Sequence, residues 1–117
     1  MYAHQGANTF DRQIVTLQNL LPQLDAEWDR LTRSIQADQQ RLTALQEWRQ
    51  EFFLLLSAEP EPAAQPALAL TGQLEMLEQR IRQVVEEIVR KQLLRRALEQ
   101  RFDEVRLVLC ALQQQGV

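Results

Sequence analysis

The chain of 117 residues is long enough for one domain and too short for two ordinary ones. Hydrophobic residues make up 45% of the chain and charged residues 25%, which excludes disorder throughout, and the net charge of −3 gives no electrostatic reason to expect a nucleic-acid partner. No stretch approaches the roughly 20 apolar residues of a membrane-spanning helix, and no signal peptide is evident, so we expect a cytoplasmic protein.

The N-terminal part is expected to hold an arm and a short helix. Residues 1–7 form the loose arm, and Asn8 or Thr9 caps a helix whose apolar residues recur at intervals of three and four. Pro22 is expected to end or kink this helix, because proline removes a backbone donor and crowds the preceding turn. Asp25 would then cap a second helix. The apolar residues of the first helix are Phe10, Ile14, Leu17 and Leu21.

Two long helices follow, and both are predicted from apolar residues that recur with a seven-residue period, the period of helices packed at shallow angles. One runs to about Leu56, and the other runs from between Pro66 and Thr71 to about Gln114. Between them, the segment 57–66 contains three prolines and is expected to be a loop that turns the chain back, so that the helices run antiparallel. The expected core anchors are Trp28, Leu31, Ile35 and Phe102.

Polar residues interrupt both apolar stripes. Asp38 interrupts the first, and Lys91 and Arg95 interrupt the second. A nearly symmetric loop would place Asp38 across from one of these two bases. We therefore expect a contact of Asp38 with Lys91 or Arg95 that fixes the register of the helices. The alternative, in which these long side chains reach solvent, stays open.

The residue types give no basis for catalysis, for a metal site or for a cofactor. His4 is the only histidine, no Cys/His cluster has metal-ligand spacing, and no glycine-rich phosphate loop is present. Acidic and basic residues alternate along the last helix, which is typical of a solvated surface rather than of a nucleic-acid or membrane interface. The single cysteine, Cys110, follows the apolar pattern and is expected to be a buried small hydrophobe.

The last helix carries more apolar residues than its stripe requires. The short first helix, of about 14 residues and roughly 20 Å, would cover some of them in a three- to four-helix bundle built on a long hairpin, a single all-α domain over residues 1–117. It is too short to cover them all, so the remainder is expected to bind another protein or a second copy of the chain. The candidate partner-binding residues are Val85, Val89, Leu93, Leu94, Leu107 and Val108.

The segment around Trp28 resembles the flagellar export chaperone family FliT. In that family a short first helix leads into a W-[DE]-x-L segment, matched here by Trp28, Asp29 and Leu31. The stretch VVEEIVRKQLLRRALEQRFDEVRLVL, residues 84–109, looks like the C-terminal helix of the family. The related family FlgN, chaperones of hook-filament junction proteins, is nearly as compatible.

The resemblance implies a cytosolic chaperone of flagellar type III export. Such a protein holds the C-terminal helix of the filament cap protein FliD in an apolar groove, prevents premature assembly and passes the client to the export gate and ATPase. One feature departs from the family: a C-terminal tyrosine helps related chaperones to dock on the gate, but the only tyrosine here is Tyr2. A self-associating coiled-coil scaffold subunit of a secretion apparatus is the alternative from a different class.

Overall fold

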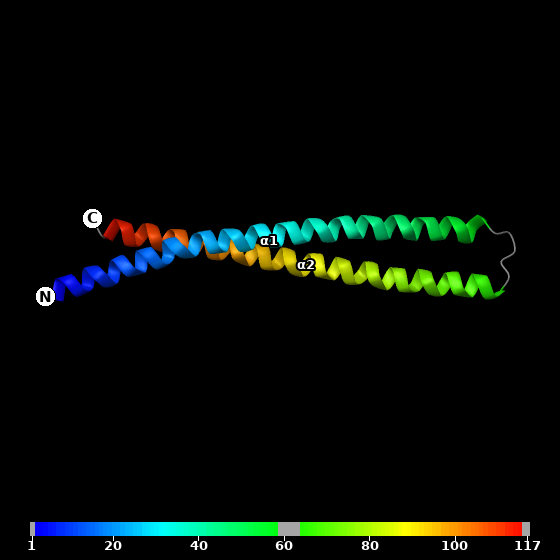
Figure 1. Cartoon of the computed structure of the whole chain (residues 1–117), viewed down its shortest axis with the longest axis horizontal. Coiled ribbons are helices and arrows are strands. Elements are labelled where there is room, and N and C mark those ends of the chain that lie inside the picture. Colours follow the sequence, from blue (N-terminus) through cyan, green and yellow to red (C-terminus); the bar gives the residue numbers. More distant parts are fainter. Residues whose placement is uncertain (1, 59–63, 116–117) are drawn as a thin grey trace. The chain divides into compact units, whose positions relative to one another are not determined.

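The computed structural model describes residues 2–58 and 64–115, and these form two long α-helices. Helix α1 spans Tyr2–Ala58, helix α2 spans Ala64–Gln115, and the two run antiparallel as a helical hairpin (Figure 1). The loop expected at residues 57–66 is shorter than predicted, since both of its ends are helical. Its central residues, 59–63, lie outside the described part of the chain, as do the side chains of Tyr2 and His4.

Helix α1 continues through Pro22, so the expected short first helix does not exist as a separate element. The prediction of a three- to four-helix bundle is therefore wrong, and so is the prediction that Asp25 caps a new helix. Residues 2–7, expected to be an arm, are also helical. Proline at this position leaves the carbonyl of Gln18 without its backbone donor. Because Pro22 is exposed while Leu24 is buried in the continuing apolar stripe, packing outweighs that local cost.

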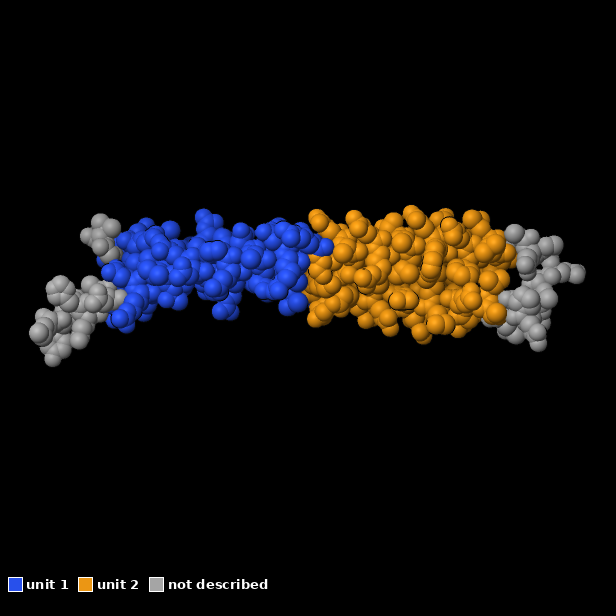
Figure 2. Space-filling view, in the orientation of Figure 1, with its two compact units in different colours: residues 1–33, 93–117 blue, residues 34–92 orange. Residues whose placement is uncertain are grey.

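The chain divides into two compact units (Figure 2). Unit 1 contains residues 1–33 and 93–117, and unit 2 contains residues 34–92. Each unit therefore combines one segment of α1 with one antiparallel segment of α2.

Unit 2 has a continuous core made of the residues that the seven-residue period places between the helices. Ile35, one of the predicted anchors, is only 2% exposed and is the most deeply buried residue of this core. Leu42 and Phe52 pack against the core from its edge. The buried cluster consists of Ile35, Leu45, Leu77, Ile81, Val84 and Ile88.

Unit 1 has a thinner core. Among its described residues only Leu24 and Val105 are buried hydrophobics, whereas the predicted anchors Trp28, Leu31 and Phe102 are half-buried. The prediction that Cys110 is buried is wrong, because its side chain is exposed. Leu109 and Leu112 hold the interhelical positions, and Cys110 follows Leu109 by one residue, a rotation of about 100° around the helix. Over the described residues, neither helix has a stretch long and apolar enough to cross a membrane.

Candidate functional site

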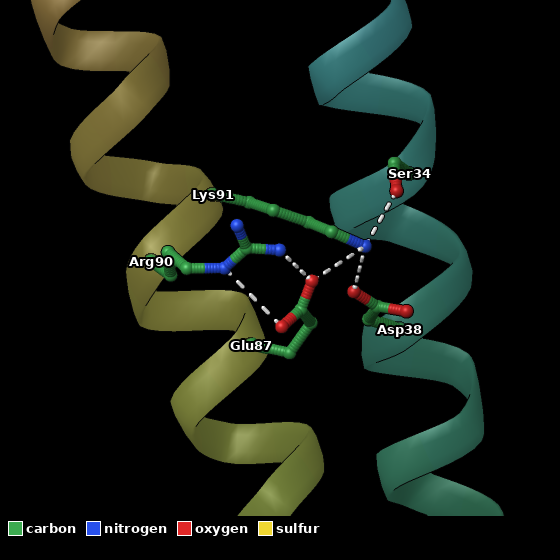
Figure 3. Close-up of polar contacts among 5 residues, drawn as sticks. All are labelled: Ser34, Asp38, Glu87, Arg90 and Lys91. Carbon is green, nitrogen blue, oxygen red and sulfur yellow. Dashed lines mark hydrogen bonds and ion pairs between the residues drawn. The ribbon is translucent and has the colours of Figure 1, made fainter.

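Asp38 is the only buried polar or charged residue among those that the structure describes, and it meets Lys91 across the hairpin of unit 2 (Figure 3). The Lys91 ammonium donates to Asp38 Oδ2 at 2.6 Å and to Ser34 Oγ at 2.7 Å. It also lies 3.8 Å from Glu87 Oε1. Of the two bases expected opposite Asp38, Lys91 therefore makes the contact.

Glu87 joins this buried pair to the surface. Arg90, three residues along α2, donates hydrogen bonds to the Glu87 carboxylate (Figure 3). That hydrogen bonding, together with the charges of Arg90 and Lys91, holds the pKa of Glu87 below its usual value, although partial desolvation opposes the shift. The same hydrogen bonding raises the pKa of Arg90. Because the Glu87–Arg90 pair is exposed, it adds little to stability.

Arg95, the other expected partner of Asp38, instead helps to hold Trp28 in unit 1. Its guanidinium lies 5.7 Å from the centroid of the Trp28 ring and donates to Thr32 Oγ1 at 3.3 Å. Trp28 Nε1 donates to Glu99 Oε1 at 2.9 Å. The apolar part of the Trp28 ring thus lies between the helices, and its indole nitrogen has a hydrogen-bond partner. This is the usual arrangement of a half-buried tryptophan. The sequence reasoning missed Thr32 and Glu99, since their pairing depends on the register of the hairpin.

All six candidate partner-binding residues of α2 are exposed, but they do not share one face of the helix. In unit 1, Leu94 and Val108 line hollows to which α1 also contributes. Leu93 directly precedes Leu94, and Leu107 directly precedes Val108, so each leucine is rotated by about 100° around the helix from that neighbour. In unit 2, Val85 and Val89 are one turn apart on a single face. The exposed fractions are Val85 41%, Val89 48%, Leu93 60%, Leu94 47%, Leu107 71% and Val108 49%.

One apolar depression that a candidate residue lines is the Leu94 groove, a hollow of about 540 Å³ in unit 1. Helix α1 contributes Leu31 to its floor, and helix α2 contributes Leu94, Ala97 and Leu98. Its polar members carry both signs of charge: Glu27, Gln100, Arg101 and Glu104. An apolar floor with mixed polar members is the usual form of a groove that receives an amphipathic helix.

Unit 2 exposes apolar residues that the sequence reasoning did not single out. Trp48 and Met76, 60% and 71% exposed, line a hollow of about 290 Å³ together with the half-buried Phe52. Leu54 and Leu55, 66% and 57% exposed, follow on α1. The run FFLLL at residues 52–56 contained the signal, because five consecutive helical residues point in all directions and cannot all be buried against one neighbour.

Within the described ranges, no group of three or more His, Cys, Asp or Glu side chains is placed to hold a metal ion. Comparisons of the chain with models of protein families, with curated proteins and with solved structures found no match.

Proposed function

We propose that the chain is a cytosolic chaperone of flagellar type III export that binds the C-terminal helix of the filament cap protein FliD. One observation carries this proposal: among the described residues, twelve large hydrophobic side chains are exposed on a hairpin that has no third helix to cover them. Exposed apolar side chains in this number favour a site for a partner. The resemblance around Trp28 supplies the class of partner, and the export gate and ATPase are the proposed recipients of the client.

The Leu94 groove is the proposed seat of the client helix. Leu31, Leu94 and Leu98 offer apolar contacts from both helices, and the small Ala97 between them lets another helix approach closely. A client helix with apolar residues at intervals of three and four would lay one face on this floor. Arg101 and Glu104 would then meet its polar flanks.

The test is calorimetric titration with a peptide that comprises the C-terminal helix of a candidate FliD. Leu94→Asp is expected to weaken binding about 30-fold, the loss typical of a central contact residue. Ala111→Asp is the matched control, because Ala111 lies on the same helix and in the same unit, is exposed, and does not line the groove. Binding within about twofold of the parent is expected for that control. Equal losses in the two variants, or no binding to the parent chain, would refute the proposal.

A second candidate function, a self-associating scaffold subunit, is favoured by the apolar residues near the hairpin loop in unit 2. Trp48, Leu55 and Met76 remain exposed there and are not part of the Leu94 groove. Sedimentation velocity with and without the peptide separates the two candidates. A peptide-dependent change that Leu94→Asp diminishes favours a chaperone, whereas a tight oligomer that ignores the peptide favours the scaffold. The same titration with a junction-protein peptide tests the FlgN-type alternative.

A further inference from the structure

Unit 1 has a second hollow, of about 400 Å³, which we call the Trp28 hollow. Its apolar lining comes from both helices, with Leu24 and Trp28 on α1 and Leu98 and Phe102 on α2. Leu98 also lines the Leu94 groove, but Leu94 itself does not line the Trp28 hollow. The remaining lining residues are Asp25, Glu99 and Asp103.

The aromatic walls of this hollow are held in place before any partner arrives. Glu99 accepts the hydrogen bond of the Trp28 indole at 2.9 Å, and Arg95 lies over the indole ring. Arg106 lies 6.0 Å from the centroid of the Phe102 ring. An aromatic surface fixed in this way loses little conformational freedom when a ligand binds.

The polar lining of the Trp28 hollow is entirely acidic. Three carboxylates border it and no basic residue does, whereas the Leu94 groove includes Arg101. Asp25 and Asp103 are exposed, and neither forms an ion pair with another described residue. The hollow therefore presents an apolar floor beside Asp25 and Asp103, which form no ion pair with another described residue, while Arg95 and Arg106 lie against its aromatic walls.

We propose that the Trp28 hollow docks an amphipathic helix of another protein in which a lysine or arginine stands next to an apolar side chain. The apolar side chain would contact Leu24, Leu98 and Phe102, and the cation would meet Asp25 and Asp103. Charge complementarity of this kind selects the partner and speeds its association. This surface is additional to the Leu94 groove, so binding of FliD and binding at the Trp28 hollow stand or fall separately.

The test uses a pair of synthetic amphipathic helical peptides that share a leucine face, one flanked by arginines and the other by glutamates at the same positions. In the full chain, Trp48→Phe removes the only other tryptophan, which lies in unit 2 and is 60% exposed, so that fluorescence reports on Trp28 alone. The arginine peptide is expected to change the Trp28 emission and to bind at least about tenfold more tightly than the glutamate peptide, with a difference that shrinks as salt is added.

The variant Asp25→Asn/Asp103→Asn is expected to weaken binding of the arginine peptide about tenfold, roughly threefold for each exposed charge pair. Asp29→Asn is the matched control: it removes the same charge from the same helix at an exposed residue that does not line the hollow, and it should leave affinity unchanged. Circular dichroism verifies that each variant is as helical as its parent.

Three results would overturn the inference. The first is that the arginine peptide leaves the Trp28 emission unchanged. The second is that the two peptides bind equally well, and the third is that the paired Asn variant binds the arginine peptide as tightly as the Asp29→Asn control does. A paired Asn variant that instead loses self-association in sedimentation would identify the occupant as a second copy of this chain, which also contradicts a separate partner.

Discussion

The buried pair of Asp38 and Lys91 gives the sharpest prediction about the fold. The Asp38 side chain is 8% exposed and the Lys91 side chain 17%. Lys91→Met would leave the Asp38 carboxylate buried without its charged partner, which should lower the free energy of unfolding by about 3 kcal/mol. Asp38→Leu should cost less, about 1 kcal/mol, because Lys91 keeps Ser34 and lies 3.8 Å from Glu87. The double variant replaces both charges by apolar groups and is expected within about 1 kcal/mol of the parent.

These values imply a coupling free energy of roughly 3 kcal/mol between the two positions. The assay is urea unfolding of all four proteins, followed by circular dichroism at two protein concentrations so that any self-association is detected. Additive effects, with coupling below about 0.5 kcal/mol, would refute the reasoning, since they would mean that the two side chains act independently.

The same pair should also hold the helices of unit 2 in register. A slip by one heptad would keep apolar residues between the helices but would place Val84 opposite Asp38 and leave the carboxylate unpaired. In the double variant that penalty is gone. Spin labels on α1 and α2 of unit 2, with Cys110 replaced by serine, should show one distance in the parent and an added population shifted by about 10 Å in the double variant. A single unchanged distance would show that packing alone fixes the register.

Three further predictions concern single residues. Pro22→Ala should raise the free energy of unfolding by about 3 kcal/mol, because it restores the backbone donor to the Gln18 carbonyl at an exposed site; an unchanged urea midpoint would contradict this. Cys110 should react with a maleimide in the native chain nearly as fast as in urea, since its side chain is exposed. By NMR titration, Glu87 should show a pKa below the usual glutamate value. Its pairing therefore adds to the free energy of unfolding at pH values above the pKa of Glu87 in the unfolded chain. This added stability is lost as the pH falls through the lower pKa of the folded state. Arg90→Gln should return that pKa toward the ordinary one.

The interhelical packing could be predicted because it depends on a local regularity. Residues seven apart return to the same side of a helix, so Ile35, Leu77 and Ile81 could be assigned to the core from the sequence alone. The contact of Asp38 with Lys91 could be predicted for a related reason. The position of the loop in the sequence determines, to within about one helical turn, which residues of the two helices face each other. Choosing Lys91 over Arg95 required the actual register.

The remaining features depend on the sizes of competing free energies and on distances between the two helices. The seven-residue pattern contains neither. Pro22 is a local signal for a helix end or a kink, yet α1 continues through it, because the apolar stripe on both sides outweighs the lost hydrogen bond. The hollows require residues from two helices at once, so Leu31 and Leu94 could not be assigned to one groove before their pairing was known. Exposure of Trp48 could not be assigned from the pattern, because Trp48 stands three residues after Leu45 and four before Phe52, the same spacing as the stripe itself.

The two units differ in a way that bears on binding. Unit 2 contains the six-residue buried cluster, whereas unit 1 has only Leu24 and Val105 as buried hydrophobics and carries both the Leu94 groove and the Trp28 hollow. Regions with few buried apolar contacts open at low free-energy cost, and binding surfaces are commonly drawn from them. We therefore expect amide hydrogens of unit 1 to exchange faster than those at the core of unit 2.

A ligand that binds unit 1 only in its folded state must also slow the exchange of its amide hydrogens, because binding disfavours local unfolding by mass action. At a free peptide concentration of 100 times Kd, the stabilisation is about 2.7 kcal/mol, which slows exchange through local unfolding about 100-fold. Peptides bound at the Leu94 groove or the Trp28 hollow should therefore slow exchange in residues 9–33 and 93–115 far more than in the core of unit 2. Uniform exchange along both helices, or protection confined to unit 2, would place the binding surface elsewhere, because protection follows the segment whose folding the ligand requires.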